Sequence, residues 1–71
     1  MTFKDAKIQL CAFDIDGQGI DDLPETLEWY DNPALGKKAA QSILVKYSDV
    51  AAVWVRRIKD AHLRTVCMVT R

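Results

Sequence analysis

The stretch DNPALGKKAAQSILVKY, residues 31–47, decides the fold because it predicts the clearest element of the chain, a helix. Asp31 and Asn32 belong to the residue types that cap helices, and Pro33 suits a first turn, where its missing N–H costs nothing. Beyond Pro33, apolar residues recur every three or four positions. These apolar positions are Leu35, Ala39, Ala40, Ile43, Leu44 and Tyr47. We therefore expect a helix that buries one face and ends near residues 47–49.

Two stretches after this helix alternate at period two and are rich in β-branched residues. Residues 50–58 and 65–70 therefore predict two strands, and residues 59–63 are short and polar enough for the hairpin loop between them. A second helix over residues 49–62 remains an alternative, because apolar residues there also fit helical spacing. Those residues are Val50, Val53, Trp54, Ile58 and Ala61.

The chain before residue 31 is less regular. Residues 7–15 alternate as a strand does, and residues 26–30 predict a second strand, joined to the first by residues 17–24. A helix over residues 3–13 is the alternative. The prediction is one α+β domain over residues 1–71, an antiparallel ββαββ sheet with one helix packed on one face. The competing fold is a mostly helical chain with an EF-hand-like loop.

The size and composition of the chain limit its class. A 71-residue chain buries only about 60% of the surface that its unfolded form exposes, so its stability is marginal or shared with a partner. An apolar fraction of 49% predicts a folded chain, and no apolar run approaches the roughly 20 residues that span a bilayer. The first residues lack the pattern of a signal peptide, which predicts a cytoplasmic protein without a membrane partner. We expect Cys11 and Cys67 to be small buried residues in a reducing compartment.

Opposite charges separate along the chain although the net charge is zero. Residues 1–32 carry two lysines against eight carboxylates, a net charge of −6, whereas residues 33–71 carry eight lysines and arginines against two aspartates, a net charge of +6. If the fold keeps this separation, the molecule is dipolar and suits self-association or a charged partner. The alternative is that neighbouring elements neutralise each other.

The stretch DIDGQGIDDLPE, residues 14–25, resembles the EF-hand loop. Carboxylates stand at loop positions 1, 3 and 12 and a glycine at position 6, as calcium coordination requires. However, Asp21 occupies position 8, which is normally apolar, and Pro24 precedes the final glutamate. Asp14 to Gly19 also suits a turn after the first strand, because aspartate and glycine favour turns. We keep calcium binding by residues 14–25 as a third functional hypothesis, after two kinds of macromolecular binding.

The same Asp-x-Asp-Gly stretch, Asp14 to Gly17, resembles the first motif of the haloacid dehalogenase superfamily, in which the first aspartate is a nucleophile. That family needs a full α/β domain with later lysine and acidic residues, which 71 residues cannot supply. His62 has no serine or cysteine partner placed by the sequence. We therefore expect a protein that is not an enzyme, without catalytic, cofactor-binding or metal-binding residues.

Binding is the remaining class of function. Trp54 and Arg56 lie on the same side of their predicted strand, and tryptophan beside arginine is typical of an interaction hot spot. The leading hypothesis is a protein-binding module whose partner is another protein or a second copy. The predicted partner-binding residues are Trp54, Arg56, Arg57, Lys59, Arg64, Asp21 and Asp22. Small chains of this kind serve phages and mobile elements as accessory or host-inhibitor proteins, the anti-CRISPR proteins among them.

The second hypothesis is nucleic-acid binding by the basic C-terminal hairpin. Its arginines and lysine could hold phosphates while Trp54 stacks on a base. The isoelectric point near 6.5 and the acidic first half of the chain argue against a nucleic-acid-binding domain.

Overall fold

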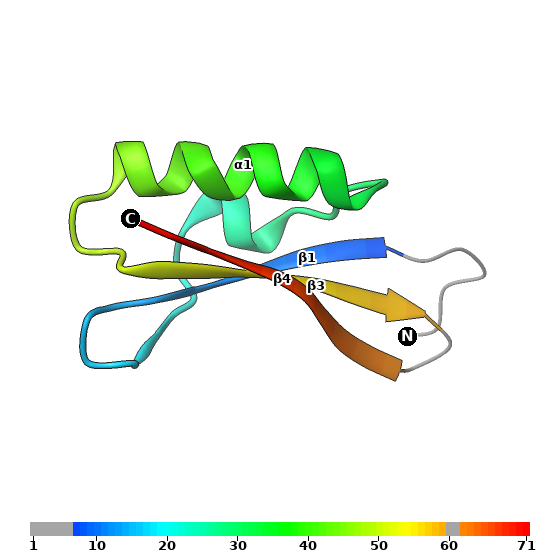
Figure 1. Cartoon of the computed structure of the whole chain (residues 1–71), viewed down its shortest axis with the longest axis horizontal. Coiled ribbons are helices and arrows are strands. Elements are labelled where there is room, and N and C mark those ends of the chain that lie inside the picture. Colours follow the sequence, from blue (N-terminus) through cyan, green and yellow to red (C-terminus); the bar gives the residue numbers. More distant parts are fainter. Residues whose placement is uncertain (1–6, 60–61) are drawn as a thin grey trace.

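The computed structural model describes residues 7–59 and 62–71 (Figure 1). Its elements are β1 (Lys7–Phe13), β2 (Gly19–Ile20), the 3₁₀ helix η1 (Pro24–Leu27), α1 (Pro33–Lys46), β3 (Ala52–Lys59) and β4 (His62–Thr70). The strands form one antiparallel sheet in the order β2-β1-β3-β4, and α1 lies across one face of it. This confirms the predicted ββαββ fold and excludes the EF-hand alternative.

The helix forms where its sequence predicts. Asn32 is the N-cap, and its Oδ1 accepts a hydrogen bond from the Leu35 N–H at 2.9 Å. At the other end, the Tyr47 N–H donates to the Ile43 carbonyl at 2.9 Å while Tyr47 itself adopts an extended conformation. Both ends are therefore fixed by local hydrogen bonds, which explains why the sequence pattern located them.

The second strand was predicted in the wrong place. Residues 26–30 do not form a strand, because Pro24 begins η1 and the hydroxyl of Thr26 donates to the Leu23 carbonyl at 2.7 Å. This local bond offers the backbone an alternative to a ladder. Tyr30 alone of that stretch pairs with β1, through two hydrogen bonds of 2.9 Å to Ile8. The strand that does follow β1 in the sequence, β2, is two residues long.

Two other predictions for strands and loops need correction. The alternative helix over residues 49–62 is wrong, because β3 occupies Ala52–Lys59. The hairpin loop is narrower than residues 59–63, since Lys59 pairs with His62, which makes His62 a strand residue. Residues 60–61 lie outside the described part of the chain. Of the alternative helix over residues 3–13, the residues before Lys7 also lie outside it, and Lys7–Phe13 is a strand.

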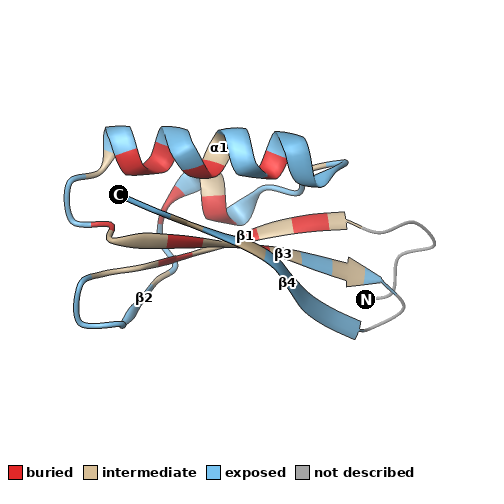
Figure 2. Ribbon diagram, in the orientation of Figure 1, coloured by how far each residue is buried: buried red, intermediate tan, exposed pale blue. Residues whose placement is uncertain are grey.

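The core lies between α1 and the sheet (Figure 2). Alternate residues of β1 and β3 meet the buried face of α1, and Leu23 and Val50 close the ends. The buried core residues are Ile8, Leu10, Ala12, Leu23, Ala40, Ile43, Leu44, Val50, Val53 and Val55. Cys11 and Cys67 are half-buried free thiols, so the prediction that both are buried is wrong, although Cys67 borders the core.

None of the helices in the described residues is long and apolar enough to cross a membrane.

Candidate interaction surfaces

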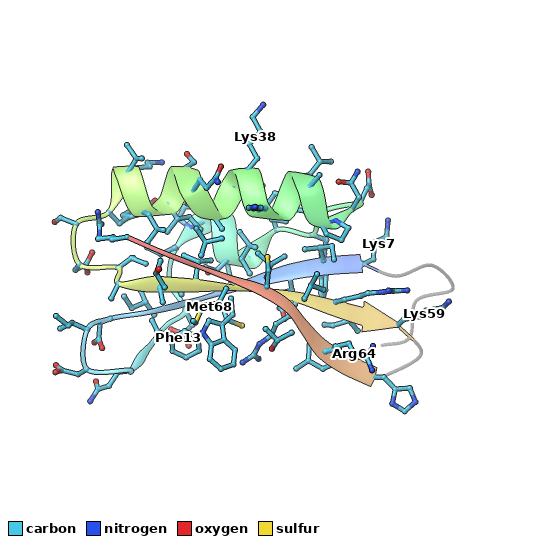
Figure 3. The ribbon with its side chains drawn as sticks, in the orientation of Figure 1. Lys7, Phe13, Lys38, Lys59, Arg64 and Met68 are labelled. Atoms are coloured by element: carbon cyan, nitrogen blue, oxygen red, sulfur yellow. The ribbon has the colours of Figure 1, made fainter. Side chains whose placement is uncertain are left out.

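The first candidate surface is the sheet face opposite α1, here called the open face. Val53 and Val55 of β3 are buried against α1. Side chains alternate along a strand, so Trp54 and Arg56 lie on the opposite face of the sheet. The pairing of Trp54 with Cys11 on one side and Met68 on the other places those residues on the same face. No described element covers this face, and Figure 3 shows Phe13 and Met68 on the side away from α1.

Trp54 is the centre of the open face. Its ring lies 5.2 Å from the Phe13 ring, centroid to centroid, with an interplanar angle of 52°. Trp54 also contacts Arg56, whose guanidinium carbon lies 5.4 Å from the centroid of the indole. Both separations fall within the range of favourable aromatic and cation–π contacts. Trp54 therefore contacts an aromatic ring and a guanidinium group on the open face.

Arg56 stacks on Trp54, and the salt bridges among the described residues do not include it. Its Nε is buried and has no hydrogen-bond partner among the described residues. A cavity of about 380 Å³ lies beside it, bordered by β1, β2 and η1. Its lining includes Gln9, Cys11, Phe13, Ile20, Leu27 and Arg56. A partner that fills this cavity would meet mostly apolar walls, the guanidinium of Arg56 and the carboxylate of Asp21.

The second candidate surface is the end of the β3–β4 hairpin, here called the basic cleft. Arg57, Lys59, His62 and Arg64 line a cavity of about 260 Å³. Arg57 pairs with Arg64 and Lys59 with His62, so all four side chains share one face of the two strands. Figure 3 shows Lys59 and Arg64 together at this end of the molecule.

The aspartates of the β1–β2 turn lie at the opposite end of the sheet, whereas Asp31 lies at the same end as the basic cleft and is paired there with Lys7. The turn between β1 and β2 begins at Asp14, whose Oδ1 accepts hydrogen bonds of 2.9 Å from the N–H groups of Asp16 and Gln18. Gly17 adopts a positive φ of 81° there. Asp14 therefore closes a turn, as expected from its sequence. Among the described residues, no group of three or more His, Cys, Asp or Glu side chains is placed to hold a metal ion.

The predicted partner-binding residues are thus distributed over three places. Trp54 and Arg56 lie on the open face, whereas Arg57, Lys59 and Arg64 line the basic cleft. Asp21 and Asp22 are exposed and follow β2, and Asp21 lines the cavity beside Arg56. The separation of charge in the sequence therefore survives only in part, as a separation between the aspartates of the β1–β2 turn and the basic cleft.

Two residues of the open face escaped prediction from the sequence. Phe13 and Met68 come from β1 and β4, and their position beside Trp54 depends on how these strands pair with β3. Alternation within each strand could have suggested a shared face, but the register between strands is set by the fold.

A polar network joins η1 to the C-terminal end of α1. The Glu25 carboxylate accepts hydrogen bonds from the Tyr47 hydroxyl at 3.0 Å and from Lys46 Nζ at 3.5 Å. The Tyr30 hydroxyl donates to the Glu25 carbonyl at 3.1 Å. This network anchors the loop that contains Glu25.

The network shifts three pKa values. Burial acts to raise the pKa of Glu25, but hydrogen bonds from its own backbone N–H and from Tyr47, with the charge of Lys46, outweigh it and lower this pKa. The Glu25 charge in turn raises the pKa of Lys46. Burial, together with the charges of Glu28 and Glu25, raises the pKa of Tyr30. Each shift arises from contacts that hold the fold together.

No protein-family model matches this sequence, and comparison with curated proteins and with solved structures found no match either.

Proposed function

We propose that this protein is a non-enzymatic protein-binding module whose partner docks on the open face. The observation that carries the proposal is the contact group Phe13–Trp54–Arg56, which lies on a sheet face that no described element covers. Tryptophan and arginine dominate the residues that contribute most to protein–protein affinity.

The exposed apolar side chains support docking of a protein. Met68, directly opposite Trp54, is 57% exposed, and Leu63 near the hairpin end of β4 is 53% exposed. Together with the cavity beside Phe13, they extend the apolar surface over three strands. Contiguous apolar surface of this kind marks an interaction site in small soluble domains. Such a surface fits a partner with an apolar contact region and an acceptor oxygen opposite Arg56.

A role in binding also suits the chemistry of the titratable groups. The groups with shifted pKa values, Glu25, Tyr30 and Lys46, contact each other or the backbone and do not line the cavity of the open face. Enzymes concentrate shifted groups around a substrate cavity. This arrangement favours binding over catalysis.

The partner is another protein or a second copy of this chain, and the site of action in this proposal is the cytoplasm. The two free thiols, Cys11 and Cys67, suit a reducing compartment. A chain of 71 residues that acts by binding suits an accessory or inhibitor protein of the kind that phages and mobile elements encode.

The experiment compares three baits: the tagged wild-type protein, Met68→Glu and Lys38→Glu. Lys38 is exposed on the outer side of α1, so its variant introduces the same charge away from the open face (Figure 3). We expect wild type and Lys38→Glu to capture the same protein, or a second copy, and Met68→Glu to lose it. Capture that Met68→Glu leaves unchanged would contradict the proposal. A wild-type protein that captures nothing and stays monomeric in ultracentrifugation would contradict it as well.

A further inference from the structure

The basic cleft is created by a local irregularity in β4. Val55 pairs with Cys67, but the next residue, Arg56, pairs with Thr65, so Val66 is an extra residue in β4. Such a β-bulge shifts the register by one residue, so that the β4 side chains on the hairpin side of Val66 point to the opposite face of the sheet from the one they would otherwise occupy. Without it, Arg57 would lie opposite Thr65, and Arg64 would point to the other side of the sheet. The bulge therefore brings Arg64 and His62 to the same face as Arg57 and Lys59.

This arrangement is unfavourable for the isolated fold. Like charges directly opposite each other on paired strands destabilise a sheet, and Arg57 lies directly opposite Arg64. The salt bridges among the described residues join Lys7 to Asp31 and Lys46 to Glu25, so neither neutralises the cleft. Asp60, between the two strands, lies outside the described residues, but one carboxylate against three permanent cations leaves an excess of positive charge. An anion bound in the cleft would remove this repulsion.

The cleft is open because α1 begins before it. The first turn of α1 packs on Ile8 and Val55 at Gly36, and Arg57 pairs with Ile8 at the edge of that contact. The end of β3 extends past the start of α1 (Figure 1). The helix therefore does not cover this part of the sheet face. The start of α1 lies at this same end of the sheet, where its dipole adds positive potential.

The charge and size of the cleft select the ligand. Two guanidinium groups, an ammonium group and an imidazole surround about 260 Å³, which suits one compact group with several negative charges. A terminal phosphate or pyrophosphate has this charge density, and arginine forms paired hydrogen bonds to it, whereas each carboxylate of an acidic peptide, like each phosphodiester of a nucleic-acid backbone, brings a single charge. We infer that Arg57, Lys59, His62 and Arg64 form a phosphate-binding site, independent of the open face.

The acidic end of the molecule does not prevent such binding. Along β3, five residue steps from Ala52, beside the acidic turn, to Arg57 separate that turn from the near edge of the basic cleft by roughly 17 Å at about 3.4 Å per residue. At physiological ionic strength this is about two Debye lengths, so the aspartates of the turn are largely screened from a ligand in the cleft. Asp31, which lies nearer, is paired with Lys7. The charge of the cleft favours a small compound with a terminal phosphate or pyrophosphate, and a nucleic-acid backbone is the second source of phosphate that the test separates.

The test is calorimetric titration with inorganic pyrophosphate at low salt, using wild type, the double variant Arg57→Gln/Arg64→Gln and the control Lys38→Gln. The replaced side chains are exposed, so the variants are expected to fold, which circular dichroism checks. We expect saturable binding by wild type and Lys38→Gln, and affinity at least ~10-fold lower in the double variant, since charge-assisted hydrogen bonds are lost. Absence of saturation in wild type, or equal affinity in the double variant, would overturn the inference.

A second arm identifies the source of the phosphate. A fluorescent single-stranded oligonucleotide and poly-glutamate are titrated into the same three proteins. Oligonucleotide binding that pyrophosphate displaces and that needs both arginines assigns the site to a nucleic-acid backbone. Binding of pyrophosphate without the oligonucleotide assigns it to a small phosphate compound. Tighter binding of poly-glutamate than of pyrophosphate would overturn the inference in favour of an acidic protein.

Discussion

Gly36 of α1 packs against Ile8 of β1 so closely that no side chain fits between them. A Cβ atom at position 36 would lie 2.6 Å from Ile8 Cγ2 and 3.1 Å from Val55 Cγ1. Both neighbours belong to the buried core and have little freedom to move. This contact therefore sets how closely the start of α1 approaches the sheet.

Replacement of Gly36 by alanine should destabilise the protein. In an exposed helix, glycine to alanine gains up to about 1 kcal/mol, but overpacking here should outweigh it and lower the free energy of unfolding by about 1–3 kcal/mol. Urea denaturation measures this difference. Gly19→Ala is the matched control, because a Cβ there meets nothing within 4 Å. A Gly36→Ala variant as stable as wild type would show that α1 sits further from the sheet.

The helix cap provides a second test. The Asn32 side chain accepts the Leu35 N–H, so Asn32→Ala should lower the free energy of unfolding by about 1 kcal/mol. Asn32→Asp keeps an acceptor oxygen at the helix start and should retain most of the stability. Thermal and urea unfolding of both variants distinguish the loss of the capping hydrogen bond from a general effect of substituting Asn32. Equal losses of stability in both variants would argue against a capping role of the Asn32 side chain.

Acid should weaken the contact between η1 and α1. The pKa of Glu25 is lower in the folded protein than its ordinary value of 4.5, so its stabilising effect is present at neutral pH and is lost as the pH falls through the folded pKa. Glu25→Gln should therefore be less stable than wild type at pH 7, and the difference should shrink below pH 4.5. A difference in the free energy of unfolding that stays constant from pH 7 to pH 3 would contradict this role.

The hydroxyl of Tyr47 gives an independent measure of the same network. Tyr47→Phe removes the donor of the 3.0 Å hydrogen bond to Glu25 and should cost about 1 kcal/mol at pH 7. In Glu25→Gln, the same substitution should cost less, because the charged acceptor is gone. A double-mutant cycle measures this coupling, and additive effects would disprove it.

Substitutions of exposed residues on the open face should leave the free energy of unfolding nearly unchanged. Met68 is 57% exposed, so Met68→Glu should change the free energy of unfolding by no more than about 0.5 kcal/mol. Urea denaturation of Met68→Glu beside wild type checks this, with Val53→Ala, in the core, as the destabilised reference. A large loss in Met68→Glu would show that Met68 supports the fold.

The parts of the fold that the sequence predicted correctly depend on local signals. The helix from Pro33 to Lys46 follows from its cap and its spacing, and β1, β3 and β4 follow from alternation. The strand β2 was missed because its two residues carry no pattern of their own and are strands only by pairing with β1. A local hydrogen bond at Thr26 stabilises η1 where the sequence had predicted a strand over residues 26–30.

The candidate sites were harder to predict, because they depend on register. Trp54 and Arg56 were found by alternation within one strand, but Phe13 and Met68 join them only through pairing between strands. The basic cleft depends on the bulge at Val66, since a shift of one residue decides which face Arg64 occupies. Nothing in the local sequence around Val66 indicates such a bulge.

Photo-crosslinking in the cells that naturally produce this protein tests the open face most directly. A photoreactive amino acid is placed at position 68, on the open face, and in a second protein at position 38, on the outer side of α1 (Figure 3). We expect position 68 to yield a discrete crosslinked product, with another protein or a second copy, and position 38 to yield none. A discrete product from position 38 with none from position 68 would contradict docking on the open face.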